Sequence, residues 1–200
     1  MKKLQTLITI MLLAWMMPAQ AQTARQVLDK AAANVNRKGG ASANFSITSG
    51  KHGGTRGTIA IKGAKFRATT PEAIVWYNGK TQWTYMKKTE EVNVSTPSQS
   101  QQASMNPYLF ITMYKKGYNL SMTKSKGNYE VHMKAQNASR SVQEMYITVN
   151  SKFLPTRVKM KHGKEWMTIN ITNFQAKNQS DAIFQFNSKD FPSAEVIDLR

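Results

Sequence analysis

The chain contains no cysteine among its 200 residues. Disulfides, thiolate metal ligands, cysteine nucleophiles and thiol redox chemistry are therefore excluded, and so is a lipid-modified N-terminal cysteine. A domain of this composition must gain its stability from side-chain packing and from backbone hydrogen bonds.

Residues that commonly carry catalysis or bind metals are also scarce. None of the three histidines, His52, His132 and His162, belongs to an H-E-x-x-H or comparable metal-binding pattern. The eleven carboxylates are scattered, and the adjacent pair Glu90-Glu91 would point to opposite faces of a strand. There is no G-x-S-x-G motif and no P-loop. We therefore expect no enzymatic activity, no cofactor and no bound metal.

Long apolar runs are limited to the N-terminus. Two lysines precede residues 4–17, which are nearly all apolar, and Pro18 and an Ala-Gln-Ala sequence ending at Ala21 follow. This is the pattern of a secretory signal peptide, and the run is short for a membrane-spanning helix, which remains the alternative. We expect a signal peptide over 1–21, cleaved after Ala21, and a single domain over 22–200.

Acidic residues are few relative to basic ones. Without Lys2 and Lys3, 26 basic residues stand against 11 acidic ones, a formal net charge of +15. Inside a cell this charge would suggest nucleic-acid binding, whereas an exported protein meets phospholipid head groups, lipopolysaccharide and acidic proteins. Because the basic residues are spread along the chain, a solvated basic sheet face is favoured over a specific patch. We expect transient contact with a membrane surface and no nucleic-acid partner.

The pattern that is present begins with a helix and continues with strands. Over 23–40, Thr23 can cap a helix and Gly39-Gly40 can end it. Its apolar stripe consists of Val27, Leu28, Ala31, Ala32 and Val35. Downstream, the apolar period changes from near 3.6 to 2, in short runs that end with Phe184 and Phe186. These runs indicate an antiparallel sheet with one face on a core and one in water.

A second helix is predicted over residues 105–117, with a strand as the alternative. Pro107 fits its first turn, Lys115 and Lys116 suit its last turn, and Gly117 can end it. Because an isolated helix of this length is unstable, it must gain its stability by docking. Its apolar side chains include Pro107, Leu109, Phe110 and Met113.

The pair Asn78-Gly79 is a strong hairpin signal. As a two-residue loop it places Trp76 opposite Thr81 and Ile74 opposite Trp83. One face then carries Ile74, Trp76, Trp83 and Tyr85. Three large aromatics present about 450–750 Å² of surface, which is more than a soluble monomer usually leaves exposed in one patch. A packed core and a partly filled cavity for an apolar ligand both remain open.

The weaker loop signal His162-Gly163 predicts another hairpin, with Met160 opposite Glu165 and Val158 opposite Met167. One face collects the apolar residues Val158, Met160, Met167, Ile169 and Ile171. The other face is basic and collects Lys159, Lys161, Lys164, Trp166, Thr168 and Asn170.

Residues 65–85, KFRATTPEAIVWYNGKTQWTY, resemble a segment of the periplasmic outer-membrane lipoprotein carriers, the LolA family. That segment has a Phe and a Pro, followed by Ile-Val-x-Asp/Asn-Gly-Lys-Thr-x-Trp-x-Tyr. The stretches 91–94, 106–111 and 196–200 resemble further family segments in the same order. The likeness covers essentially the whole chain after residue 21.

The resemblance implies a mainly β fold: one curved antiparallel sheet, a half-barrel of about eleven strands. An N-terminal helix and a short lid helix would cover its concave hydrophobic face. The lid residues would be Pro107, Leu109, Phe110 and Met113. It also implies a monomeric periplasmic chaperone that takes acylated lipoproteins from an inner-membrane ABC transporter to an outer-membrane acceptor. The acyl chains would bind in a hydrophobic cavity formed by Phe45, Ile59, Ile61, Phe66, Ile74, Trp76, Trp83, Tyr85, Val158, Met160, Met167 and Ile169.

The chain departs from the family after its second predicted strand. Many members have Lys-Arg-Pro at that turn, where the arginine helps to hold the lid, whereas this chain has Lys62-Gly63-Ala64. Arg67 is the nearby candidate substitute. Two alternative functions remain: a half-barrel envelope sensor that recognises lipoproteins or lipopolysaccharide, and a glycolipid shuttle.

Overall fold

A computed structural model describes residues 22–50, 53–98, 101–102 and 110–200 of the chain. The expected signal peptide, residues 1–21, lies outside these ranges, so that prediction stays untested. No helix of the described residues is long and apolar enough to cross a membrane.

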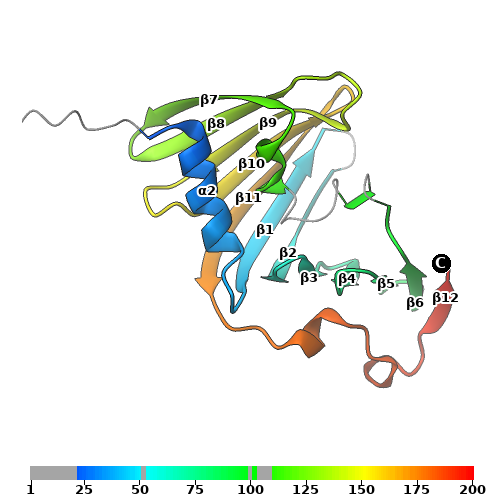
Figure 1. Ribbon diagram of the computed structural model, residues 1–200. Coiled ribbons are helices and arrows are strands. Elements are labelled where there is room, and N and C mark those ends of the chain that lie inside the picture. Colours follow the sequence, from blue (N-terminus) through cyan, green and yellow to red (C-terminus); the bar gives the residue numbers. More distant parts are fainter. Residues whose placement is uncertain (1–21, 51–52, 99–100, 103–109) are drawn as a thin grey trace, which may run out of the picture.

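One sheet of twelve strands dominates the fold, as Figure 1 shows. Its strands are β1 (Ala41–Ser49), β2 (Gly53–Lys62), β3 (Lys65–Thr69), β4 (Ala73–Tyr77), β5 (Gln82–Met86), β6 (Glu91–Ser95), β7 (Tyr118–Ser125), β8 (Asn128–Ala135), β9 (Val142–Val149), β10 (Pro155–His162), β11 (Glu165–Ala176) and β12 (Glu195–Asp198). The spatial order is β12-β6-β5-β4-β3-β2-β1-β11-β10-β9-β8-β7. All neighbours pair antiparallel except β12 and β6, which are parallel. The predicted mainly β, single-sheet fold is confirmed, with one strand more than expected.

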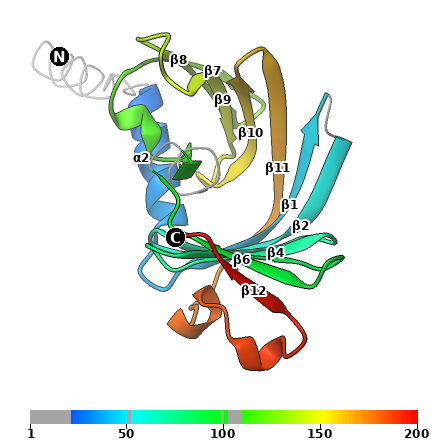
Figure 2. The ribbon, with the colours of Figure 1, turned by 90° about the vertical axis from the view of Figure 1, so that its right-hand side faces the viewer.

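Helix α2 (Ala24–Val35) lies across the concave face of the sheet (Figures 1 and 2). Thr23 caps it as predicted: the Thr23 hydroxyl accepts from the Gln26 N–H, and the Gln26 side chain accepts from the Thr23 N–H. The predicted apolar stripe is the buried set, namely Val27, Leu28, Ala31, Ala32 and Val35. These side chains meet a core formed by β7 to β10, where Val131, Met133, Met145 and Ile147 are fully buried.

The predicted helix over 105–117 is interrupted in its described part. Phe110 is helical, residues 111–112 form a turn, and a 3-10 helix η1 (Met113–Lys115) comes next. Gly117 ends the segment as predicted, with a φ of 77° that favours glycine. Residues 103–109 lie outside the described ranges, so the lid positions Pro107 and Leu109 are not placed.

The C-terminal segment lies against the convex face of β3 to β6 (Figure 2). It contains two 3-10 helices, η2 (Asp181–Phe184) and η3 (Ser188–Asp190), before β12. The prediction that Phe184 and Phe186 alternate on a strand is therefore wrong. The Ser180 hydroxyl accepts from the Ala182 N–H and starts the tight helical turn instead.

Both hairpins differ from their predicted registers by two residues. Trp76 lies opposite Trp83 and Ile74 opposite Tyr85, because the Asn78 side chain accepts from the Lys80 and Thr81 N–H groups and widens the loop. Met160 likewise lies opposite Met167 rather than Glu165. A shift of two keeps every side chain on its predicted face, since the side-chain period of a strand is two.

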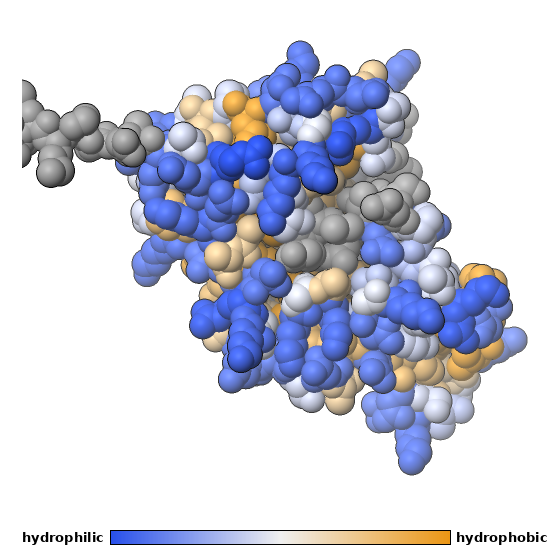
Figure 3. Space-filling model, viewed as in Figure 1, coloured by the Kyte–Doolittle hydropathy of each residue, from blue (hydrophilic) through white to orange (hydrophobic). Residues whose placement is uncertain are grey.

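Hydrophilic residues cover most of the face in Figure 3, and hydrophobic ones gather near β12. Two of the exposed large hydrophobic side chains, Val196 and Leu199, belong to this end of the chain.

Candidate functional site

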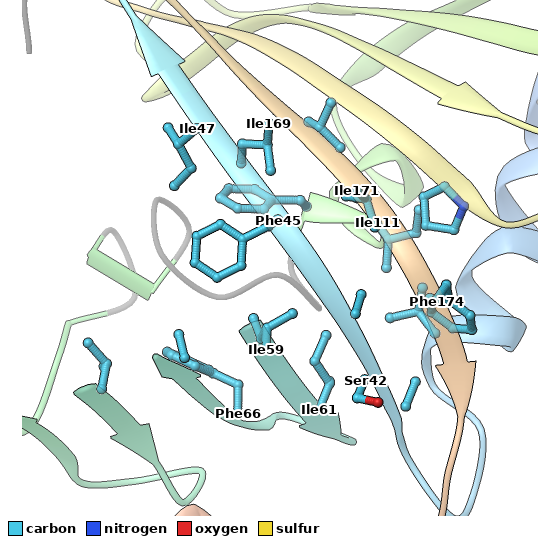
Figure 4. Close-up of a pocket in the computed structure, with 18 of the residues that line it drawn as sticks. Ser42, Phe45, Ile47, Ile59, Ile61, Phe66, Ile111, Ile169, Ile171 and Phe174 are labelled. Atoms are coloured by element: carbon cyan, nitrogen blue, oxygen red, sulfur yellow. The ribbon is translucent and has the colours of Figure 1, made fainter. Parts of the chain in front are cut away.

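The concave face holds an apolar cavity of about 350 Å³, shown in Figure 4. Nineteen of its 22 described lining residues are apolar, and Ser42, Thr55 and Thr70 are the polar ones. The apolar lining residues are Val35, Ala41, Ala43, Phe45, Ile47, Ile59, Ile61, Phe66, Ala68, Val75, Phe110, Ile111, Ile147, Pro155, Val158, Met167, Ile169, Ile171 and Phe174. A cavity of this size and lining suits a hydrocarbon ligand.

Strand β1 forms the central part of the cavity wall. Its alternate residues Ala41, Ala43, Phe45 and Ile47 line the wall, over a length of about 20 Å at the rise of a strand. On one side β1 pairs with β11, which brings Ile171 opposite Phe45 and Ile169 opposite Ile47. Since directly opposed residues share a face, two strands distant in sequence supply one continuous apolar wall.

Two local backbone features shape this wall. Asn173 has a φ of 51°, and the β1–β11 register shifts there, which brings Phe174 to the cavity. Gly57 lies opposite Phe45, and a Cβ at Gly57 would be 3.0 Å from the Phe45 ring and 2.1 Å from the Thr69 carbonyl oxygen. Glycine is therefore needed at position 57 for close strand packing beside the ring.

Phe110 and Ile111 lie across the cavity from the sheet and are 7% and 4% exposed. The segment that follows them contacts α2. The Tyr114 hydroxyl donates to the Asp29 carboxylate, and the Arg25 guanidinium lies 5.8 Å from the centre of the Tyr114 ring. These contacts with α2 hold the segment that follows Ile111.

The apolar environment of the concave side disfavours charged groups. No charged side chain is among the described residues that line the cavity. Burial raises the pKa of Tyr77, which lies on the concave face and donates from its hydroxyl to the Gly79 carbonyl at 2.9 Å. No group of metal-ligating side chains occurs in the described part of the chain. The described lining of the site therefore suits apolar groups.

The structure brings many of the predicted cavity residues together. Phe45, Ile59, Ile61, Phe66, Val158, Met167 and Ile169 line the cavity, and so does the predicted lid residue Phe110. Met160 is buried in the adjoining core, and Met113 packs against that core; neither lines the cavity.

The aromatic face of the β4–β5 hairpin does not line the cavity. The prediction for Ile74, Trp76, Trp83 and Tyr85 is therefore corrected, because these residues lie on the convex face of the sheet. There Trp76 contacts Phe186 and Phe191, and Tyr85 contacts Phe191, with ring centroids 4.7–5.6 Å apart. The opposite face of β4 supplies Val75 to the cavity instead.

Sequence reasoning also missed cavity residues that its own alternation could have found. Ile47 is two residues from Phe45, and Ile171 is two residues from Ile169. Phe174 carries no such signal, because only the bulge at Asn173 turns it to this face.

Arg67 does not hold the lid. It lies on the convex face with its guanidinium 5.7 Å from the centre of the Trp76 ring. The lysines beside the turn at residues 62–64 also serve the C-terminal segment: Lys62 and Lys65 pair with Asp181 at 3.2 and 3.0 Å.

Comparisons with known proteins agree with this architecture. Residues 15–164 match the family described as "Outer membrane lipoprotein carrier protein LolA". No curated protein sequence gives a match.

Several solved structures are similar to the chain. An uncharacterized conserved protein from Thermus thermophilus has a TM-score of 0.59 at 13% identity, over 88% of this chain and 99% of that one. A LolA superfamily protein from Nitrosomonas europaea has a TM-score of 0.48 at 15% identity, over 83% and 99%. The MucA/MucB complex of Pseudomonas aeruginosa has a TM-score of 0.46 at 11% identity, over 83% and 62%. The Thermus thermophilus structure shares the fold.

Proposed function

The chain belongs to the LolA family of outer membrane lipoprotein carrier proteins, and on that premise we propose that it binds the acyl chains of lipoproteins in its concave cavity. It would act as a non-enzymatic periplasmic carrier. An inner-membrane ABC transporter would be the donor of the lipoprotein, and an outer-membrane protein the acceptor.

The observation that carries this proposal is the apolar cavity spanned by Phe45, Ile169 and Phe110. Each buried CH₂ group contributes about 0.8 kcal/mol, so a 16-carbon acyl chain resists leaving a membrane by roughly 12 kcal/mol. A soluble carrier must therefore offer the chain a continuous apolar wall. The wall of β1, β2 and β11 has that character over about 20 Å.

Release requires that the site can also empty. Phe110 and Ile111 supply the apolar contacts that cover the sheet when no acyl chain is bound. An entering acyl chain would replace these contacts with its own, so the lid exchanges one apolar partner for another. The link from Tyr114 to Asp29 would keep the end of the lid attached to α2 during this movement.

The convex face of β10 and β11 provides a surface for transient membrane contact. The Lys159 and Lys161 ammonium groups lie 4.7 and 5.9 Å from the centre of the half-exposed Trp166 ring. Lysines beside an interfacial tryptophan suit a surface of anionic head groups.

The experiment is to purify the protein from native periplasm and identify its bound material by mass spectrometry. Acylated lipoproteins in a one-to-one complex are expected, and the Ile169→Asp variant, prepared in parallel, should carry none. Recovery of wild-type protein without any acylated partner would contradict the proposal. The same preparation separates the alternatives, because a sensor would co-purify with a membrane signalling protein and a glycolipid shuttle with glycolipid alone.

A further inference from the structure

A second hollow, of about 420 Å³, lies on the convex face of the sheet. We propose that it binds an anionic group attached to a hydroxyl-rich body, the chemistry of a sugar phosphate or of a phosphorylated lipid head group. This hollow opens on the other face of the sheet from the apolar cavity, and the strand residues Ser42, Ala43 and Ile59 border both.

The floor of this convex pocket consists of two cross-strand rows. In one row Gln175 lies opposite Ser42, Ser42 opposite Ala60, and Ala60 opposite Arg67. In the other row Asn44 lies opposite Thr58, and Thr58 opposite Thr69. Lys177, Gln179 and Ile183 of the C-terminal segment form a wall. Four strands and a returning segment thus hold the pocket in place.

Arg67 is the residue that points to a ligand. Its Nε is buried and has no hydrogen-bond partner within the described part of the chain. Its guanidinium lies over the Trp76 ring, which limits its movement. Buried polar groups in proteins are nearly always hydrogen-bonded, so a fixed guanidinium with an unpaired buried N–H is suited to an incoming acceptor.

The charge of the pocket selects an anion. Arg67 and Lys177 line it, and no carboxylate is among its described lining residues. The nearby acid of the same segment, Asp181, is already paired with Lys62 and Lys65. Phosphate is the anion that a guanidinium and an ammonium group bind well, because both can donate charge-assisted hydrogen bonds to it.

Most of the remaining lining side chains suit hydroxyl groups rather than hydrocarbon. They are the amides of Asn44, Asn173, Gln175 and Gln179 and the hydroxyls of Ser42, Thr58 and Thr69, beside the apolar residues Ala43, Ile59, Ala60 and Ile183. Amides and hydroxyls both donate and accept, as do the hydroxyls of a sugar or of glycerol. The small Ala60 leaves room for such a body between the two basic residues.

The test is calorimetric titration of the purified protein with glucose 6-phosphate and, separately, with glucose. Binding of the phosphate sugar, with glucose at least about tenfold weaker, is expected, because neutral glucose lacks the phosphate that accepts charge-assisted hydrogen bonds from Arg67 and Lys177. Arg67→Gln and the exposed Lys177→Gln should each weaken binding by about tenfold. Arg56→Gln is the matched control, since Arg56 is on the same face of β2 and does not line the pocket.

Vesicles of phosphatidylglycerol and of phosphatidylcholine distinguish the two sources of the ligand. Binding to phosphatidylglycerol vesicles that depends on Arg67 and Lys177, without binding of glucose 6-phosphate, identifies a lipid head group. Dependence on the same two residues with the soluble sugar identifies a free phosphate ester. The proposal is overturned if neither ligand binds, or if Arg56→Gln reduces binding as much as Arg67→Gln does.

Discussion

The ring of Trp76 lies edge-on to the ring of Phe191, with centroids 5.6 Å apart and planes at 80°. This contact joins the middle of the sheet to the C-terminal segment on the convex face. The sequence resemblance assigned the aromatic face of the β4–β5 hairpin to the cavity. In the structure this face packs against the C-terminal segment and stabilises the fold, whereas the opposite face of the sheet lines the cavity.

Phe191→Ala should therefore lower stability and leave acyl-chain binding unchanged. Phe191 is half-buried, so we expect the free energy of unfolding to fall by about 2 kcal/mol, less than the 3–5 kcal/mol typical of a fully buried phenylalanine. Urea unfolding measures this, with Leu199→Ala as the exposed control. Loss of acyl-chain binding by a folded Phe191→Ala protein would contradict the separation of roles.

Ile169→Asp should abolish binding of a fluorescent fatty acid, because it places a carboxylate in the apolar wall of the cavity. The neighbouring substitution Thr168→Asp is the matched control, since position 168 points to the opposite face of the same strand. We expect at least a tenfold loss of affinity for Ile169→Asp and little change for Thr168→Asp. Equal losses in both variants would mean that the cavity is not the binding site.

Fixing the lid to the sheet should stop uptake of acyl chains. The chain has no cysteine, so Phe110→Cys combined with Ile59→Cys introduces the only two thiols. A short cleavable reagent that links them would hold the lid segment over the cavity wall, which both positions line. Fatty-acid uptake should be lost on linking and return on cleavage. Full uptake by the linked protein would show that these contacts need not open.

Reversing two charges on the basic convex face should weaken membrane contact. The double variant Lys159→Glu/Lys161→Glu should bind anionic vesicles more weakly than wild type, by about 1 kcal/mol or more per lysine. Vesicle sedimentation at low and high salt measures this, since added salt should reduce the difference. Lys80→Glu/Lys88→Glu makes the same charge change at exposed positions elsewhere. If that control loses as much affinity, the contact depends on net charge alone.

Acid should loosen the attachment of the C-terminal segment. Hydrogen bonds from Lys65 and Lys62 lower the pKa of the Asp181 carboxyl below its ordinary value of 3.8. A lowered pKa means that these bonds stabilise the fold above pH 3.8 and are lost as the pH falls through the folded-state value. Asp181→Asn should therefore be less stable than wild type at pH 7, and the two should converge as the pH falls below the folded-state pKa of Asp181. A stability difference that is independent of pH would exclude this ion pair as its cause.

The sequence predicted which side chains share a face of the sheet, but it did not predict the direction in which the sheet curves. Alternation assigned Trp76, Trp83 and Tyr85 correctly to one face although the loop at Asn78 is longer than predicted, because a two-residue shift preserves facing. Alternation could not identify the concave face, because both faces of β4 are apolar. Val75 lies on one face and Trp76 on the other.

The reason is that the second apolar layer comes from a distant part of the chain. The spacing of the aromatic residues Phe184, Phe186 and Phe191 is too irregular to indicate that they cover a sheet. Their 3-10 turns depend on local caps at Ser180 and Asn187. The helix α2 was predictable because its cap at Thr23 and its apolar stripe are local in sequence, but it ends at Val35 with Asn36 as its C-cap, before the two glycines that were expected to end it.

The parallel pairing of β12 with β6 also constrains how the chain folds. Val92 and Val94 of β6 and Trp76 of β4 are buried on a side that the final segment covers, more than a hundred residues after Trp76. A chain made from its N-terminus has these side chains uncovered until its last residues are available. Contacts between residues so distant in sequence slow folding and leave intermediates with exposed apolar surface. A chain truncated near its C-terminus should therefore aggregate rather than form a smaller functional protein.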